Sequence, residues 1–218
     1  MDTGTLVSLL GEGLLQTLYM TVLGTLMSYV IGLPIGVSLI VTGPNGIRPV
    51  AIYNKVMGFI VNVIRSVPFL ILMIALMPYI RKVIGTGIGT SATTAALVVA
   101  AAPFVARLVE QSLLEVDPGV IEAAQAMGAG NFQIIRKVLL LEARPSLLNG
   151  AAVATINILG YSAMAGIVGG GGLGDLAIRY GLYRFQPSIM WITIIVLVIL
   201  VQILQEAGIR FASRMDNR

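Results

Sequence analysis

The 218-residue sequence contains no cysteine, no histidine and few charged residues. The absence of cysteine excludes disulfides and thiol nucleophiles. Without either residue type, zinc sites of the usual ligand set and histidine general bases are excluded as well. Charged residues make up 11% of the chain, against roughly 25% in a soluble domain. These absences point away from the common classes of soluble enzyme.

Apolar residues make up 57% of the chain, and the mean hydropathy is +0.93. This composition indicates an integral membrane protein. Because a span needs about 20 residues, the chain has room for about four to six spans and for no sizeable soluble domain. We predict an all-α polytopic membrane protein, a single domain over residues 1–218 with five transmembrane helices. The predicted spans are about 14–41, 57–80, 88–106, 147–168 and 189–207.

The first predicted span carries a ladder of small residues at four-residue intervals: Gly24, Ser28, Gly32 and Gly36. These positions share one helical face, and small side chains let helix backbones approach closely in lipid. We interpret the ladder as a surface for helix or dimer packing rather than as a ligand site.

The second apolar stretch is interrupted by Arg65-Ser66-Val67-Pro68. Pro68 lacks an N–H and disfavours helical geometry at Val67, so a kink or a helix restart is expected there. A charge within the membrane is costly and normally faces protein or water, which makes Arg65 a candidate for the translocation pathway. The alternative is that the hydrocarbon span begins at Ser66 and that Arg65 extends to the cytoplasmic interface.

The fourth predicted span carries Asn157, Tyr161 and Met164 on one helical face. Polar groups at this depth point inward, either for hydrogen bonds between helices or for contact with a substrate. We keep all three as candidates for the pathway, with helix-to-helix bonding as the alternative. The segment GGGGLGD that follows matches a dinucleotide-binding pattern, but it follows a membrane span rather than a strand. We therefore expect a re-entrant or extracytoplasmic loop.

A polar-bearing stretch from Glu122 to Leu141 separates the third and fourth spans. Asp117 and Pro118 are suited to the N-cap and first position of a helix that continues over residues 121–127. Gly128 and Gly130 supply the freedom needed for a turn, and Asn131 can cap a second short helix over about 132–141. We call residues 117–141 the EAA segment, and we expect two short helices that meet at a glycine hinge.

Within this segment Glu122, Ala123, Ala124 and Gly128, followed nine residues later by Val138, Leu139, Leu140 and Leu141, match the cytoplasmic EAA signature of bacterial ABC importer permeases. The departures are Val138 for isoleucine and Leu141 for proline. Along nearly its whole length the chain resembles the permeases of methionine-type importers. The resemblance implies a type I importer fold with a cytoplasmic coupling loop at about 108–146.

The resemblance also implies the partners of the chain. It implies a homodimer of permeases, two ATPase subunits and one extracytoplasmic binding protein. The expected contacts with the ATPase are made by the helix that carries the signature, at Ile121, Glu122, Ala123, Ala124, Met127 and Gly128. The chain contains no Gly-x-x-x-x-Gly-Lys-Ser/Thr loop, so no cofactor is expected on it, and ATP and magnesium belong to the partner. The implied role is transport without enzymatic activity in this chain.

The implied substrate is methionine, as the D or L isomer, or a derivative. Met164 beside Tyr161 could offer a soft apolar surface to a thioether. The main alternative function is an ATP-independent secondary transporter or channel. Ion-coupled transporters usually carry carboxylates within the membrane, and no Asp or Glu falls in the middle of a predicted span. An amphipathic hairpin on the lipid surface is the alternative for the EAA segment.

The distribution of basic residues predicts the orientation of the chain in a bacterial cytoplasmic membrane. Five spans place the termini on opposite sides. With the loop at about 108–146 inside, nine Lys and Arg residues lie inside and four outside, with Arg65 uncounted. We therefore expect the N-terminus outside, the C-terminus inside and the EAA segment in the cytoplasm.

Overall fold

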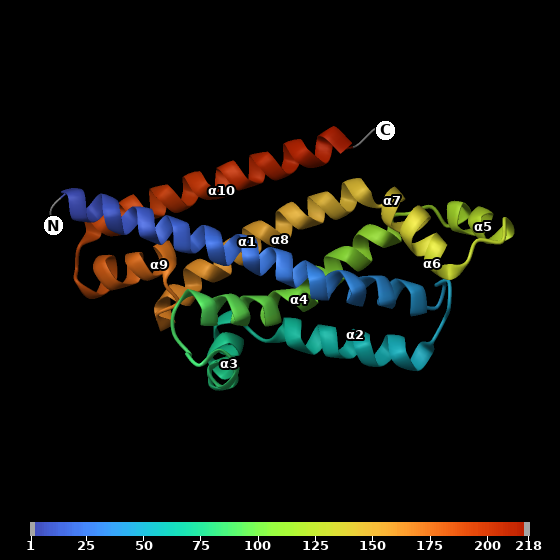
Figure 1. Ribbon diagram of the computed structural model, residues 1–218, viewed down its shortest axis with the longest axis horizontal. Coiled ribbons are helices and arrows are strands. Elements are labelled where there is room, and N and C mark those ends of the chain that lie inside the picture. Colours follow the sequence, from blue (N-terminus) through green and yellow to red (C-terminus); the bar gives the residue numbers. More distant parts are fainter. Residues whose placement is uncertain (1–2, 216–218) are drawn as a thin grey trace.

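The computed structural model describes residues 3–215, and it confirms the prediction of an all-α fold (Figure 1). The remaining residues of the predicted domain, 1–2 and 216–218, lie outside the described part. The elements are α1 Thr3–Thr42, α2 Ala51–Ser66, α3 Phe69–Ile84, α4 Thr90–Leu114, α5 Pro118–Ala126, α6 Asn131–Ile134, η1 Ile135–Leu139, α7 Leu140–Glu142, α8 Arg144–Ala165, η2 Gly166–Val168, α9 Gly172–Leu176, η3 Ala177–Tyr183 and α10 Pro187–Met215.

Helix α4 is the buried centre of the fold, and α1 packs along it. The small-residue ladder of α1 makes this packing possible. A Cβ added at Gly32 would lie 2.7 Å from Cγ1 of Val105, and one added at Gly36 would lie 2.6 Å from the carbonyl oxygen of Ala106. Only a residue without a side chain lets the two backbones approach this closely. The ladder therefore packs within the chain.

The described residues contain four helices that are individually long and apolar enough to cross a membrane, and α2 with α3 gives a fifth if the pair counts as one span. The predicted stretch 57–80 is two helices that meet at 104°. The break falls where Pro68 predicts it, since Val67 is extended with φ −80° and ψ 126°. The kink or helix restart expected at Pro68 is therefore a sharp bend between two helices.

Helix α4 continues to Leu114, beyond the predicted span end at residue 106. Arg107 and Glu110 consequently lie on the same helix one turn apart, where they form an ion pair. Because each charge is compensated by the other, the helix does not need to end before them. The helix therefore extends past the predicted end of the span.

The glycine-rich segment after α8 is compact and mostly buried. It forms the turn before α9, whose residues Gly172 to Leu176 are all buried. The N–H of Gly172 donates to Oε1 of Gln16 at 2.7 Å, and the N–H of Leu173 donates to Oγ1 of Thr17 at 2.9 Å. The glycines thus allow the backbone to approach α1.

Candidate functional site

The EAA segment lies at one end of the elongated molecule, away from the start of α1 and from α9 (Figure 1). Helix α5 begins as the sequence predicts. Asp117 is its N-cap, with Oδ1 accepting from the N–H of Gly119 at 2.8 Å, and Pro118 is its first residue. The cap satisfies one of the free N–H groups at the start of the helix. The residue at which α5 begins is therefore determined by local sequence.

The turn after α5 depends on one glycine rather than two. Gly128 has φ +79°, and its N–H donates to the carbonyl oxygen of Gln125 at 2.9 Å. Gly130 has φ −72°, an ordinary value, and it is the N-cap of α6. Its N–H donates to Oε1 of Gln133 at 3.1 Å. The expectation that Asn131 caps the second helix is wrong, because Asn131 is already the first helical residue.

The second helix of the EAA segment is interrupted by a π-helical turn. Helix α6 is followed by η1 and then by α7, which ends at Glu142 and is separated from α8 by the single residue Ala143. Proline at the last position of the signature would interrupt backbone hydrogen bonding there. With Leu141 at that position the helix continues, so the departure from the signature is accommodated without a break.

The two faces of α5 differ in exposure. Ala124 is buried, and Ile121 packs against the core cluster built from Val105 and Leu139. Glu122, Ala123, Met127 and Gly128 are exposed. The structure thus turns two of the six expected contact residues inward, because α5 needs an apolar face to hold it against the chain.

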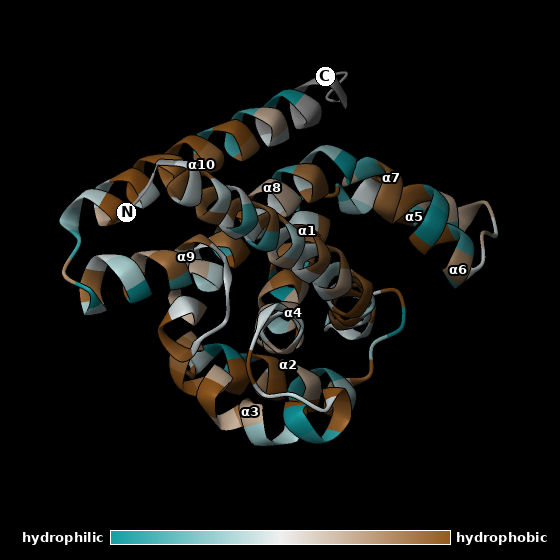
Figure 2. Cartoon of the chain, turned by 60° about the vertical axis from the view of Figure 1, so that its left-hand side comes forward, coloured by the Kyte–Doolittle hydropathy of each residue, from teal (hydrophilic) through white to brown (hydrophobic). Residues whose placement is uncertain are grey.

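Two large apolar side chains project from the turn between α5 and α6. Met127 is 82% exposed and Phe132 is 72% exposed. In Figure 2, α5 shows both hydrophilic and hydrophobic segments, while hydrophobic residues dominate α10. Exposed aromatic and Met side chains within a polar surface are typical of protein interfaces. Phe132 was not among the expected contacts, although its place beside the hinge could have indicated it.

Arg65 and Tyr161, which lie far apart in the sequence, line the same hollow. The hollow lies where the α2–α3 break meets α4 and α8. Sequence reasoning missed two further members of its wall. Phe104 lies under the guanidinium of Arg65, at 6.0 Å from Cζ to the ring centroid, and Phe69 stacks on Tyr161 with 4.4 Å between centroids. The position of Phe69 directly after Pro68 could have indicated it.

Asn157 and Met164 do not line this hollow. Nδ2 of Asn157 donates to the carbonyl oxygen of Val153 in its own helix at 2.9 Å. Met164 is 51% exposed. The structure therefore brings together two of the four pathway candidates, while the half-buried Asn157 and the exposed Met164 lie outside the hollow.

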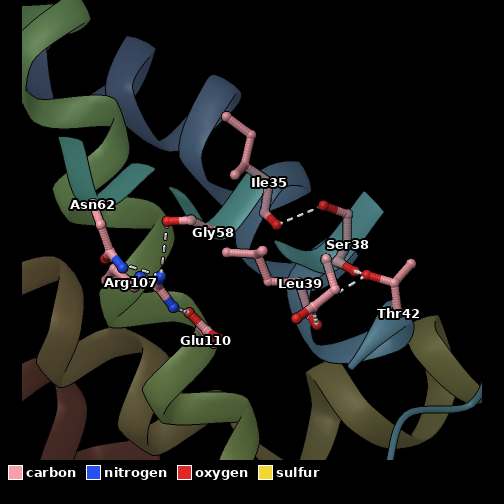
Figure 3. Close-up of polar contacts among 9 residues, drawn as sticks. Ile35, Ser38, Leu39, Thr42, Gly58, Asn62, Arg107 and Glu110 are labelled. Carbon is pink, nitrogen blue, oxygen red and sulfur yellow. Dashed lines mark hydrogen bonds and ion pairs between the residues drawn. The ribbon is translucent and has the colours of Figure 1, made fainter. Parts of the chain in front are cut away.

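A polar cluster joins α2 to α4 (Figure 3). Arg107 forms an ion pair with Glu110, and it donates to Oδ1 of Asn62 at 3.0 Å and to the carbonyl oxygen of Gly58 at 3.2 Å. The pair is mostly shielded from solvent, with side-chain exposures of 21% and 18%. These contacts fix α2 beside α4. Within residues 3–215 no group of three or more carboxylate, histidine or cysteine side chains is arranged to hold a metal ion.

A bundle of apolar helices that are long enough to cross a membrane, with an exposed short helix at one end, is the architecture of a polytopic membrane protein. The family model described as "Binding-protein-dependent transport system inner membrane component" matches residues 32–208. The chain belongs to this family.

Within the family, the chain is similar to proteins described as D-methionine transport permeases. It is 49% identical over 203 residues to the probable D-methionine transport system permease protein MetI of Vibrio cholerae serotype O1, covering 93% of this chain and 90% of that protein. It is 49% identical over 158 residues to D-methionine transport system permease protein MetI of Escherichia coli K12, covering 72% and 73%.

Solved structures give the same result. A chain from the inward-facing MetNI methionine ABC transporter matches with a TM-score of 0.97 at 44% identity, over 100% of both chains. A chain from an amino acid ABC transporter with histidines matches with a TM-score of 0.73 at 22% identity, over 100% of this chain and 99% of that one. At that identity the second match shows the fold alone.

Proposed function

We propose that this chain is the membrane-spanning permease subunit of an ATP-driven ABC importer of methionine, as the D or L isomer, and its derivatives. The observation that carries the proposal is the EAA segment, a capped helix held to the core by Ile121 and Ala124 while Glu122, Ala123 and Met127 face outward. The similarity to MetI proteins and to the MetNI structure supports the substrate class.

In the proposed mechanism the chain supplies the path and a separate ATPase supplies the energy. ATP and magnesium bind the partner, whose closure moves α5 and alternates the access of the path between the two sides of the membrane. Because Ile121 of α5 packs on the cluster that contains Leu139 of η1 and Val105 of α4, displacement of α5 would reach α4 through this cluster. This chain would bind no cofactor and carry out no hydrolysis.

The proposed assembly is a permease homodimer with two ATPase subunits and one extracytoplasmic binding protein, in the bacterial inner membrane. The dimer and the ATPase partners are supported by the similarity to MetNI. The count of nine Lys and Arg residues inside against four outside, with the loop at about 108–146 inside and Arg65 uncounted, supports a cytoplasmic EAA segment, an external N-terminus and a cytoplasmic C-terminus. The proposed path is lined by Arg65, Asn157, Tyr161 and Met164.

The proposal is tested with Gly128→Asp in the chain co-expressed with its ATPase. A Cβ at Gly128 meets nothing within 4 Å in this chain, so a side chain there would obstruct a partner, and the strain of a non-glycine residue at φ +79° is the effect that a control has to match. Gly85→Asp is the matched control, because Gly85 also ends a helix at positive φ, +88°, in open space. We expect Gly128→Asp alone to lose the co-purified ATPase and nucleotide-dependent methionine uptake in proteoliposomes.

Equal retention of the ATPase by both variants would remove the coupling role from the EAA segment. Methionine transport by the isolated wild-type chain without nucleotide would instead favour the ATP-independent transporter.

A further inference from the structure

The hollow at the break between α2 and α3 is an open recess, lined by the exposed Arg65 and by half-buried residues of α3, α4 and α8. Two helices that meet at 104° cannot both lie flat against α4, so space remains at the corner. The recess holds about 230 Å³ and is lined at its corner by Arg65, Val67 and Phe69, and on the facing helices by Phe104 and Tyr161. Pockets for drug-sized ligands hold roughly 300–1,000 Å³. The recess is therefore suited to a small molecule.

Arg65 brings an uncompensated positive charge to this recess. The ion pairs recorded within residues 3–215 belong to Arg107, Arg179 and Arg210, and Arg65 takes part in none of them. Its recorded partner is the ring of Phe104. A ring face holds a cation but leaves the N–H groups of the guanidinium fork free for an anion. The chemistry of the recess therefore favours a carboxylate or phosphate.

Helix α3 begins at the same recess, with Pro68 as its N-cap and no side-chain cap. The N-terminal end of a helix carries a partial positive charge from its unpaired N–H groups. This charge has the same sign as that of Arg65. The N-terminal end of α3 thus favours an anion in the recess, as the guanidinium of Arg65 does.

The remaining wall is aromatic. Phe69 and Tyr161 stack with an interplanar angle of 10°, so together they present a broad, rigid apolar surface. Such surfaces accept aliphatic chains, and thioether sulfur makes favourable contacts with aromatic rings. The recess thus combines a cationic group that can bind an anion with an apolar wall. This combination matches a compact amphiphile with one carboxylate and one apolar chain.

We propose that this recess is a binding subsite for a free amino acid with an apolar side chain. In this assignment Arg65 holds the α-carboxylate, and the stacked pair of Phe69 and Tyr161 receives the side chain. The inference rests on the proposed function and deepens it, because it gives the permease selectivity of its own for its substrate. A lipid phosphate offers the same anionic chemistry, and the experiment separates the two sources.

The test uses this chain complexed with its ATPase in nanodiscs of phosphatidylcholine, labelled with photo-methionine, a diazirine analogue that keeps the α-carboxylate. We expect adducts in residues 64–72 and 100–104, displaced by methionine and not by methionine methyl ester. Arg65→Gln should lower this labelling roughly tenfold to a hundredfold, as expected for the loss of a charge-assisted hydrogen bond. Arg81→Gln, the same change at an exposed arginine of α3, should label like wild type.

Two further arms keep the result interpretable. Arg65→Lys keeps the cation without the bidentate fork, so it should label at an intermediate level if it elutes as a single peak in size-exclusion chromatography. Adding phosphatidylglycerol should leave wild-type labelling unchanged. If phosphatidylglycerol abolishes the labelling, or if the methyl ester competes as well as methionine, the recess is a lipid headgroup site and the inference is overturned.

ATP-dependent methionine uptake by the wild-type complex with its binding protein is measured in parallel. Normal uptake together with labelling that Arg65→Gln does not change would overturn this inference and leave the proposed function standing. Absence of uptake would overturn the proposed function and, with it, the inference.

Discussion

The contact between α1 and α4 predicts opposite effects for the same substitution at two positions of α1. Gly36→Ala would place a Cβ 2.6 Å from the carbonyl oxygen of Ala106 and 2.7 Å from Cβ of Val109. Gly11→Ala would place its Cβ in open space, with nothing within 4 Å. The two variants have the same change in composition and the same helical backbone, so they isolate the cost of separating α1 from α4.

The expected change in the free energy of unfolding results from two opposing effects. Alanine is favoured over glycine within a helix by about 1 kcal/mol. Overpacking of a filled interior typically costs about 1–3 kcal/mol, and here one of the obstructing atoms is backbone, which cannot rotate away. We therefore expect Gly36→Ala to destabilise the protein by roughly 1 kcal/mol and Gly11→Ala to stabilise it by up to roughly 1 kcal/mol.

The assay is thermal unfolding of detergent-purified protein, followed by the area of the size-exclusion peak after heating. The absence of cysteine rules out thiol-reactive dyes for this chain. A difference of about 2 kcal/mol corresponds to a separation of roughly 4–8 °C in Tm for a chain of this size. If Gly36→Ala unfolds at or above the temperature of Gly11→Ala, the close approach of α1 and α4 is not required for stability and the reasoning fails.

Three other changes have defined outcomes. Asp117→Ala removes the acceptor for the N–H of Gly119, so the stability of α5 should fall by about 1 kcal/mol. Its amides should then exchange hydrogen faster than in wild type, with the amides of the rest of the chain as internal control. Gly174→Ala would overlap the backbone of Ala163 and should abolish monodisperse expression, whereas Gly160→Ala, in open space, should not. Arg107→Gln leaves the shielded carboxylate of Glu110 unpaired and should lower the free energy of unfolding, measured by thermal unfolding, by about 1–3 kcal/mol. Adding Glu110→Gln to this variant should recover part of the loss. If the double variant recovers nothing, the two residues do not act as a pair.

The sequence by itself determined the features that depend on local chemistry. Hydropathy defined the class of protein, because a helix that crosses lipid must carry apolar side chains and satisfies its backbone hydrogen bonds within itself. Pro68 determined the break between α2 and α3, since the residue before proline is driven out of the helical region. Asp117 and Pro118 fixed the start of α5 through a cap that involves only neighbouring residues. The family signature was readable for the same reason, as its spacing is local.

Only the tertiary structure decided which distant residues meet. Nothing in the local pattern of α5 could say that Ala124 faces the core while Ala123 faces outward, because two adjacent alanines differ only in what packs against them. The contacts of Arg107 with Asn62 and with the carbonyl oxygen of Gly58 depended on where α2 packs. The assembly of Arg65, Phe69, Phe104 and Tyr161 into one recess depended on the angle between α2 and α3. That angle is set by packing against α4 and α8, which local periodicity does not encode.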